Sequence, residues 1–303
     1  MTKLSIIIPT FNSGATLERC LASIASQTFS DYEILIQDGG SSDNTIDLIQ
    51  NWEKANAGVG VKLQQEKDKG IYDAMNKAVL RASGEWLYFL GSDDELHDPH
   101  VLERVMGSKA ADSSNVIYGS VKRVGGESNS DIYDGRFTLT KLLCKRRNIC
   151  HQAIFYRASF AREIGQYNTN YAILADWDYN MRCWSKTRFS FLDLTVAIYS
   201  MDGISSHGPG DSRFDADFTA NISRYFNSSA PHNWVVLNRI VSASKAEMAY
   251  SMREEGNPCC LSAMTFSIVK WPFGNLNRYK VWTHMLLTRL GIFADKSRPA
   301  PLK

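Results

Sequence analysis

The chain has 303 residues, of which 44% are hydrophobic and 22% are charged, and its formal net charge is +2. These values are ordinary for a soluble globular protein with one large domain or two small ones. The nearly balanced charge argues against a general nucleic-acid binder, and we expect no nucleic-acid partner. No window approaches the roughly 18 uninterrupted apolar residues of a membrane-spanning helix, so we expect none.

Cysteine spacing and the first ten residues both favour a cytoplasmic protein. The six cysteines form no C-x-x-C pair and show no zinc-ligand spacing, so we expect reduced thiols. The opening "MTKLSIIIPT" is not expected to be a signal peptide, because its apolar run is too short and ends at Pro9.

Strands and helices alternate along the first 95 residues. Short apolar runs predict strands at 4–8, 32–36, 61–65 and 85–90. Between them, apolar residues at helical spacing predict helices after residue 16, after the turn 37–45, and at 71–82. Four alternations of this kind indicate a mostly parallel α/β sheet with helices on its faces.

The pattern changes in the rest of the chain. Further strands are predicted at 115–124, 153–157 and 188–199, and a helix is predicted to begin near Asp176. Helical patterns dominate beyond Gly210, where 12 Lys and Arg oppose 7 Asp and Glu in residues 209–303. We therefore expect an α/β domain at 1–208, with halves 1–95 and 96–208, and a helical, basic C-terminal region at 209–303.

Polar side chains cluster where the four predicted N-terminal strands end. Open parallel sheets bind ligands beyond the carboxyl ends of their strands. The residues at those ends are Pro9, Thr10, Phe11, Asn12, Asp38, Asp68, Asp93 and Asp94. Any one of the acids could belong to a turn or a helix cap. Brought together, their charge is more typical of a site for a divalent metal and sugar hydroxyls.

Two other nucleotide-binding classes fit less well. A nicotinamide dehydrogenase needs G-x-G-x-x-G after its first strand, and "PTFNSG" stands there instead. A sugar nucleotidyltransferase needs a glycine-rich, Arg-containing phosphate loop at the same place, and that loop is also missing. No P-loop GxxxxGK[ST] occurs in the chain.

Four segments, in order, resemble the motifs of inverting glycosyltransferases of family 2, which have the GT-A fold. They are "SIIIPTFNSGATLERCLASIASQ", "YEILIQDGGSSDNT", "DKGIYDAMNKAVLRASGEWLYFLGSDD" and "ADWDYNMR". The segments "DKGIYDAMNKA" and "CHQAIFYR" further resemble a bacterial subset that builds O-antigen and exopolysaccharide units on lipid carriers. The resemblance covers roughly residues 2–205 and implies a Rossmann-like nucleotide-binding sheet.

The resemblance implies roles for individual residues at the donor side. The loop that holds the base and ribose matches Pro9, Thr10, Phe11 and Asn12, and the acid that binds uridine matches Asp38. The donor side is further lined by residues that match Asp68, Asp73 and Asn76. In place of D-x-D stands Ser92-Asp93-Asp94, so we expect Asp94 to ligate Mn²⁺ or Mg²⁺, with Asp93 contacting the ribose or the metal.

The resemblance also implies a catalytic base at Asp176. The family's usual E-D pair is Ala175-Asp176 here, so the helper acid is missing. Asp178 is the rival base, and helical spacing points the two side chains in different directions. We expect His151 to lie near the donor diphosphate or the acceptor, although a structural histidine is the ordinary alternative.

The implied activity is transfer of a hexose or N-acetylhexosamine from a nucleotide-sugar, expected to be a UDP-sugar, to a hydroxyl of a lipid-linked glycan. Alternatives are an inactive nucleotide-sugar-binding member of the fold and a sugar nucleotidyltransferase. The sequence is compatible with an oligomer, and it does not identify the sugar, the acceptor or the linkage.

The end of the chain predicts peripheral docking on the inner face of the cell membrane. Residues 256–303 contain seven Lys and Arg against one acid, Asp295, and are rich in Trp, Phe and Leu. Aromatic and basic residues together suit the interface of an anionic bilayer. Packing of these helices on protein is the alternative.

Overall fold

The computed structural model describes most of the chain. Described are residues 2–56, 58–125, 132–133, 136–144, 147–201, 211–226, 242, 246, 249–250, 253, 260–270 and 276–289. These residues fall into two compact units. The first comprises 1–137 and 148–216, and the second comprises 138–147 and 217–303. The predicted boundary at 208/209 lies outside the described residues.

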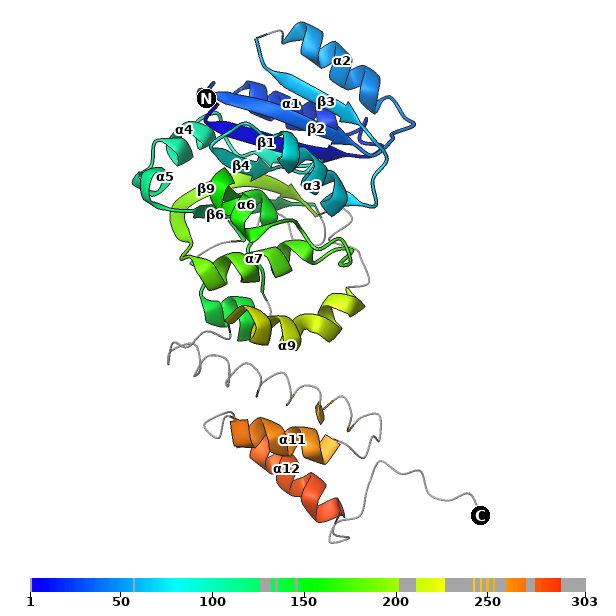
Figure 1. Cartoon of the computed structure of the whole chain (residues 1–303), viewed down its shortest axis with the longest axis vertical. Coiled ribbons are helices and arrows are strands. Elements are labelled where there is room, and N and C mark those ends of the chain that lie inside the picture. Colours follow the sequence, from blue (N-terminus) through cyan, green and yellow to red (C-terminus); the bar gives the residue numbers. More distant parts are fainter. Residues whose placement is uncertain are drawn as a thin grey trace. The chain divides into compact units, whose positions relative to one another are not determined.

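The first unit contains a mixed sheet with helices on both faces (Figure 1). Its strands are β1 (Leu4–Thr10), β2 (Tyr32–Asp38), β3 (Val61–Gln65), β4 (Trp86–Phe89), β5 (Glu95–Leu96), β6 (Val116–Val124), β7 (Ile132–Tyr133), β8 (Ile154–Arg157) and β9 (Ser190–Ser200). Its helices are α1 (Leu17–Ala25), α2 (Thr45–Ala55), α3 (Ile71–Arg81), α4 (Val101–Met106), α5 (Lys109–Ser113), the 3₁₀ turn η2 (His151–Ala153), α6 (Ala158–Ile164) and α7 (Ala175–Lys186).

The strands follow the order β3-β2-β1-β4-β8-β6-β9-β5, with β7 paired to β6. The first four are parallel, as the alternating sequence pattern predicts. Strand β8 runs antiparallel to both β4 and β6, and joins the parallel half to the second half. The sequence therefore predicted the parallel half correctly, while the pairing of the later strands was not specified.

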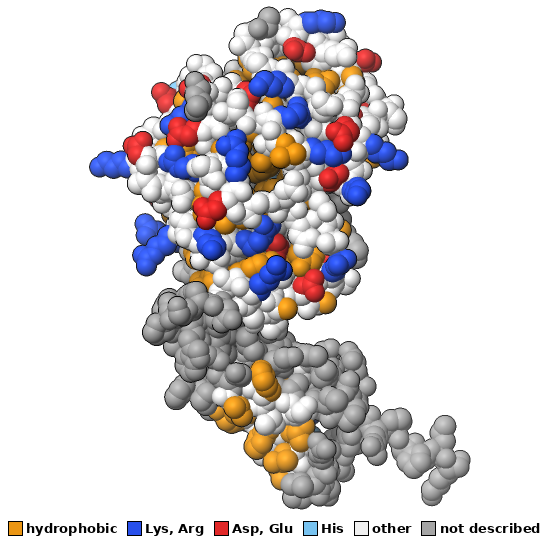
Figure 2. Space-filling view, in the orientation of Figure 1, with side chains coloured by type: hydrophobic (Ala, Val, Ile, Leu, Met, Phe, Trp, Pro, Cys, Tyr) orange, Lys and Arg blue, Asp and Glu red, His pale blue; other side chains and the backbone are white. Residues whose placement is uncertain are grey.

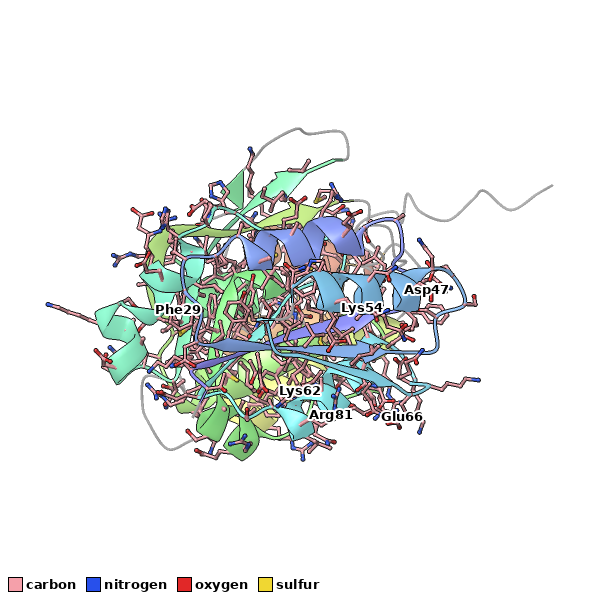
Figure 3. The ribbon with its side chains drawn as sticks, turned by 90° about the horizontal axis from the view of Figure 1, so that it is seen from above. Phe29, Asp47, Lys54, Lys62, Glu66 and Arg81 are labelled. Carbon is pink, nitrogen blue, oxygen red and sulfur yellow. The ribbon has the colours of Figure 1, made fainter. Side chains whose placement is uncertain are left out.

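Alternation along the parallel strands divides the buried residues between two layers. Ile6 and Ile8 of β1, with Ile34 of β2, belong to a core cluster that also contains Leu21 and Ile24 of α1. Side chains of opposite parity face α3, which packs against β1 and β2. Figure 3, seen from above, shows α1 and α2 on one side of these strands and α3 on the other.

The α3 side of the sheet contains polar contacts along β2 and β3. Lys62 of β3 and Arg81 of α3 are labelled there in Figure 3. Lys62 Nζ lies 2.6 Å from Glu33 Oε2, and Arg81 Nη2 donates to Gln37 Oε1 at 2.9 Å. These contacts link β2 to β3 and α3, and they involve none of the loops that follow the parallel strands.

The second unit contains helices among its described residues. These are η1 (Thr140–Cys144, a π-helix), most of α9 (Ser212–Phe226, which begins in the first unit), α11 (Cys260–Lys270) and α12 (Leu276–Arg289). Met264 of α11 and Met285 of α12 belong to one buried cluster with Ala246 and Ala249. The predicted helical character of the C-terminal region is therefore confirmed for the residues that the structure describes.

Candidate active site

The loops after the four parallel strands meet at one edge of the sheet. Thr10 pairs with Asp38 across β1 and β2, and Asp38 pairs with Gln65 across β2 and β3, so these strands end together. A Cβ built on Gly39 would lie 2.5 Å from Asp68 Oδ2, so the loops after β2 and β3 touch. We call this edge, formed by the loops 11–16, 39–44, 66–70 and 90–94, the donor edge.

The loops after β1 and β4 are joined by a side-chain hydrogen bond. The hydroxyl oxygens of Ser13 and Ser92 lie 2.9 Å apart. Asn12 adopts a left-handed backbone with φ 50°, and its Oδ1 accepts a hydrogen bond from the backbone N–H of Ser42 at 2.8 Å. Phe11 is 64% exposed beside these contacts. The donor edge therefore presents an aromatic ring on a loop that its neighbours fix.

Asp38 is fully buried and accepts hydrogen bonds from the turn that follows it. Its carboxylate accepts hydrogen bonds from the backbone N–H of Gly40 and Ser41 at 3.0 and 2.9 Å. The hydroxyls of Thr10 and Ser41 also donate to it, at 3.0 and 2.5 Å. Because no part of Asp38 is exposed, contact with uridine would require the turn to rearrange. Its predicted uridine role stays a prediction.

The side chains of α3 and of the loop before it are also engaged. Asp68 Oδ1 accepts from the backbone N–H of Gly70 at 2.9 Å, and Asp73 Oδ2 accepts from that of Lys69 at 3.0 Å. Asn76 is buried, and its amide both donates to and accepts from the backbone of Tyr167, at 3.0 and 2.8 Å. Asn76 therefore ties α3 to the loop 165–174, whereas Asp68 and Asp73 remain partly exposed.

The two acids after β4 have different surroundings. Asp94 is 1% exposed, and its oxygens accept hydrogen bonds from Gln152 Nε2 at 2.7 Å and from the backbone N–H of Ser200 at 2.8 Å. Burial, and then the neighbouring Asp93 carboxylate, raise the pKa of Asp94 to about 7. Asp93 is partly exposed. This geometry favours Asp93 over Asp94 as the metal ligand, contrary to the preference expected from the sequence.

The donor edge fits a metal that is shared with a ligand. No group of three or more His, Cys, Asp or Glu that could hold an ion occurs among the described residues. Mg²⁺ commonly takes one or two protein carboxylates, with phosphate and water oxygens completing its shell. A single accessible carboxylate at Asp93 is compatible with that arrangement.

His151 lies in an aromatic environment. Its ring stacks on Phe89 with centroids 5.1 Å apart, and its Nε2 lies 2.9 Å from the Tyr167 hydroxyl. Burial lowers the pKa of His151 to about 4, so the imidazole is neutral at pH 7. A neutral ring does not supply the partial positive charge expected beside a diphosphate. Its predicted position near donor or acceptor remains a prediction.

Asp176 lies in the first turn of α7 and is held by donors from other elements. Its Oδ2 accepts from Asn148 Nδ2 at 2.7 Å, and Tyr72 Oη of α3 lies 3.1 Å from its Oδ1. Burial raises the pKa of Asp176 to about 6, and the hydrogen bonds from Tyr72, the helix backbone and Asn148 oppose that rise. A carboxylate with this pKa is charged at pH 7 and can accept a proton.

Asp178 is a different kind of group, although it lies only two residues away. It is 1% exposed, and its Oδ2 lies 3.0 Å from Arg182 Nε in an ion pair along α7. Arg182 is fixed in turn by the backbone carbonyls of Ile164 and Gln166, at 3.0 and 2.8 Å. Asp178 is therefore committed to a structural pair, which favours Asp176 as the base.

Sequence reasoning missed the residues that surround these carboxylates. Tyr72 and Asn148 contact Asp176, and Gln152 contacts Asp94. Asp211 caps the start of α9 and also accepts from the backbone N–H of Ile173 at 3.2 Å, which fixes the loop before Asp176. Asn148 lies two residues before the "CHQAIFYR" segment that carries part of the family resemblance, and Gln152 lies within it. That proximity was the available signal.

Comparison with known proteins decides the family. The family model "Glycosyl transferase family 2" matches residues 5–171. A "PGL/p-HBAD biosynthesis glycosyltransferase" of Mycobacterium bovis is 44% identical over 213 residues, 69% of this chain and 81% of that protein. The chain belongs to glycosyl transferase family 2. It is thus a glycosyltransferase, and the functional class that its sequence predicts is confirmed.

Another relative and two solved structures are also similar to this chain. A Campylobacter jejuni "GalNAc(5)-diNAcBac-PP-undecaprenol beta-1,3-glucosyltransferase" is 42% identical over 96 residues, 32% of this chain and 31% of that enzyme. The S. aureus TarS 1–349 structure in complex with UDP-GlcNAc has a TM-score of 0.66 at 19% identity, covering 96% of this chain and 88% of TarS.

A mannosyltransferase of Pyrobaculum calidifontis, in complex with GDP-Man and Mn²⁺, has a TM-score of 0.56 at 13% identity, covering 95% of this chain and 80% of that one. Together with the mixed α/β sheet, these likenesses confirm the predicted GT-A fold. The narrower resemblance to O-antigen enzymes stays a prediction.

Proposed function

We propose that this glycosyltransferase inverts the anomeric centre of a UDP-sugar donor, with Asp176 as the catalytic base. The observation that carries the proposal is the environment of Asp176. Its carboxylate is oriented by Tyr72 and Asn148, and its pKa is raised by burial to about 6. A base is most effective when its pKa lies near the working pH, because it is then both deprotonated and basic.

The proposed step is a single displacement. The acceptor hydroxyl oxygen forms a bond to the anomeric carbon while the bond from that carbon to the diphosphate oxygen breaks. The leaving nucleoside diphosphate keeps the bonding electron pair, and Asp176 takes the hydroxyl proton. Attack opposite the leaving group converts an α-linked donor into a β-linked product. General-base assistance of this kind contributes about 10²–10⁴-fold.

The donor edge is the proposed nucleotide-sugar site. In support, TarS, which shares the fold, is described in complex with UDP-GlcNAc. The exposed ring of Phe11 offers an apolar face for the nucleobase of the donor, and Asn12, Asp68 and Asp73 surround the same edge. Asp93 would hold Mn²⁺ or Mg²⁺, which when bound stabilises charge on the diphosphate. The mannosyltransferase likeness, a complex with Mn²⁺, supports this choice.

The proposed acceptor is a glycan on a lipid carrier, in the biosynthesis of a surface polysaccharide. The name of the C. jejuni relative includes an undecaprenol-linked glycan, which supports this class of acceptor. The transferred sugar is a hexose or an N-acetylhexosamine. The identity of the sugar depends on pocket contacts that the unliganded site leaves undefined.

Incubation with a panel of UDP-sugars and Mn²⁺ tests the proposal. We expect one UDP-sugar to be consumed, with transfer to a lipid-linked glycan and slow release of UDP without acceptor. NMR of the product should show the opposite anomeric configuration from the donor. Binding without turnover would indicate an inactive member, and release of pyrophosphate from UTP and sugar-1-phosphate would indicate a nucleotidyltransferase. Either result would reject the proposal.

We further propose that the C-terminal helices bring the enzyme to the cytoplasmic face of the membrane. Within the described residues, no helix combines the length and hydropathy needed to cross a bilayer. Phe266 and Val269 of α11 are 42% and 73% exposed, and hydrophobic side chains gather on the described surface of α11 and α12 (Figure 2). Exposed aromatic side chains and basic side chains near the lipid headgroups each strengthen binding to a membrane surface.

Fewer Lys and Arg side chains are available at the surface of the C-terminal helices than the sequence count suggests. Arg278 of α12 is 6% exposed and donates to Ser267 Oγ at 2.9 Å, so it is part of the interior. Lys280 is exposed. Lys296, Arg298 and Lys303 lie outside the described residues.

Sedimentation with vesicles tests the docking. Wild-type protein should pellet with anionic vesicles, less so with neutral ones, and less in high salt. Val269→Ser should weaken the binding. Leu80→Ser is the matched control, because Leu80 is 76% exposed but lies on α3 of the first unit. Equal recovery of wild type and Val269→Ser in every pellet would reject docking through α11.

A further inference from the structure

The Asp176 carboxylate contacts the side chains of Tyr72 and Asn148. The Tyr72 hydroxyl contacts both Asp176 Oδ1 and the backbone carbonyl of Ile173, but a phenol has a single hydrogen. Asn148 Nδ2 donates to Asp176 Oδ2 at 2.7 Å. The Asn148 amide carries two N–H hydrogens, so its donation to this carboxylate does not depend on a single shared hydrogen.

Asn148 is joined through a chain of hydrogen bonds to Asn180 and, beyond it, to Tyr156. Asn180 Nδ2 of α7 donates to Asn148 Oδ1 at 2.9 Å. Tyr156 Oη of β8 donates to Asn180 Oδ1 at 2.7 Å. Asn180 is fully buried, and it lies about one helical turn beyond Asp176 on α7. The base and the residue that orients its donor thus belong to one rigid element.

The direction of this chain follows from the charge of Asp176. A carboxylate accepts only, so it requires the NH₂ side of Asn148. The oxygen of Asn148 then faces Asn180, which must present its own NH₂ group, and the oxygen of Asn180 is left for the Tyr156 hydroxyl. Reversing either amide would place two acceptors together inside the protein, which is costly. The charge of Asp176 therefore determines the orientation of the Asn148 amide, which in turn determines that of the Asn180 amide.

We propose that Asn148 is a positioning residue for the base Asp176, and that Asn180 and Tyr156 fix the orientation of its amide. The assignment rests on the proposed function of Asp176. It also accounts for the missing helper acid at Ala175: an amide donor takes a place beside the base and favours its charged form. A neutral donor avoids the repulsion that a second carboxylate would bring.

Other titratable groups face Asp176 from each neighbouring element. Tyr72 of α3, Cys150 before β8, Tyr156 of β8 and Tyr167 before α7 all interact with its charge, and their own pKa values are raised by burial. On α7, Asp178 is paired with Arg182. All four facing groups are neutral through the range where Asp176 titrates, so a shift of its midpoint reports the hydrogen bonds to it.

A titration without substrate tests the inference. Aspartate ¹³Cγ resonances of the full-length protein are followed from pH 4 to pH 9, and Asp176→Asn identifies the resonance of Asp176. Removing a hydrogen bond to a charged group should raise the midpoint by about one pH unit or more in Asn148→Ala. Asn180→Ser should raise it less. Asn51→Ala, an exposed position on α2, is the control and should leave it unchanged.

Kinetics with the UDP-sugar found in the donor panel provide a second readout. In Asn148→Ala, the acidic limb of kcat should move to higher pH, with about a fivefold loss at pH 6 for a shift of about one unit, most of it recovered by pH 9, and an unchanged KM for donor. An unmoved Asp176 midpoint, or a loss of kcat that is equal at every pH, would overturn the inference. A shifted midpoint in a protein that transfers no sugar would instead reject the proposed function alone.

Discussion

Asp38 at the donor edge and the candidate base Asp176 are held in different ways. At the donor edge, Asp38 is satisfied largely by its own turn, through the backbone N–H groups of Gly40 and Ser41. Asp176 is instead satisfied by side chains from α3 and from the loop before β8, in addition to the start of its own helix. The first arrangement is local in sequence, and the second depends on the packing of distant segments.

One short segment connects the two regions. Asn148 donates to Asp176, and Gln152, four residues later, donates to Asp94 at the donor edge. The same segment places His151 against Phe89 of β4. Displacing residues 148–152 should therefore disturb both regions together, whereas changes inside either one should be separable. The predictions below use this difference.

The largest expected effect is the loss of the base. Asp176→Asn should lower kcat by about 10²–10⁴-fold, because the amide keeps the shape of the carboxylate but not its basicity. The Kd for the UDP-sugar, measured by calorimetry, should change little. Asp178→Asn is the matched control: it should keep kcat within about threefold but lower stability by roughly 3 kcal/mol, because Arg182 loses its buried partner. The opposite ranking of the two kcat values would reassign the base.

A second comparison separates Asp93 from Asp94. Asp93→Ala should lower metal-dependent transfer at least about 100-fold, since a metal ion supplies several kcal/mol of charge stabilisation. Saturating Mn²⁺ should restore part of the activity if the diphosphate still holds the ion. Asp94→Asn should chiefly lower the melting temperature, because it disturbs the bonds from Gln152 and Ser200. If metal affinity falls only in Asp94→Asn, the sequence-based choice of Asp94 is right.

The raised pKa of Asp176 predicts opposite effects on activity and stability. The base must be charged, so kcat should rise about tenfold per pH unit below pH 6 and level off above it. The fold favours the protonated form, since the pKa is raised from 3.8 to about 6. Charged Asp176 therefore costs stability above pH 6, and the cost disappears as the pH falls below 3.8.

Asp176→Asn should accordingly raise the free energy of unfolding at pH 8 by up to about 3 kcal/mol, and so raise the melting temperature. Neither increase is expected at pH 4. Calorimetric melts of both proteins at the two pH values measure this difference. A variant less stable than wild type at pH 8 would show that the hydrogen bonds to the charged form outweigh its burial.

The smallest effect is expected at His151. His151→Ala should lower stability by about 1–2 kcal/mol through loss of the ring contact with Phe89 and the hydrogen bond with Tyr167. The neutral ring gives no reason for a large change in kcat, so a decrease below tenfold is expected. A hundredfold decrease in kcat with unchanged stability would place His151 in direct contact with donor or acceptor.

Hydrophobic alternation and strand-end polar motifs predicted much of the first unit. The parallel strands β1, β2 and β4 coincide with strongly apolar runs, because a buried parallel strand must be apolar on both faces. Strand β3 lies at the edge of the sheet and is partly exposed, and its sequence VKLQQ is correspondingly mixed. The loops of the donor edge were also predicted to meet, for a reason of sheet geometry. Parallel strands that are in register bring their carboxyl ends to one edge.

The sequence by itself thus determined the α/β class, the family, the edge of the sheet that carries the polar loops, and Asp176 as a candidate base. Only the tertiary structure shows that Asp176 and Asp178, and likewise Asp93 and Asp94, have different surroundings, since neighbouring carboxylates have the same intrinsic chemistry. Their differences come from burial and from partners distant in sequence, such as Tyr72, Asn148 and Gln152. Burial and hydrogen bonding set a pKa and an orientation, and both depend on contacts that local sequence does not encode.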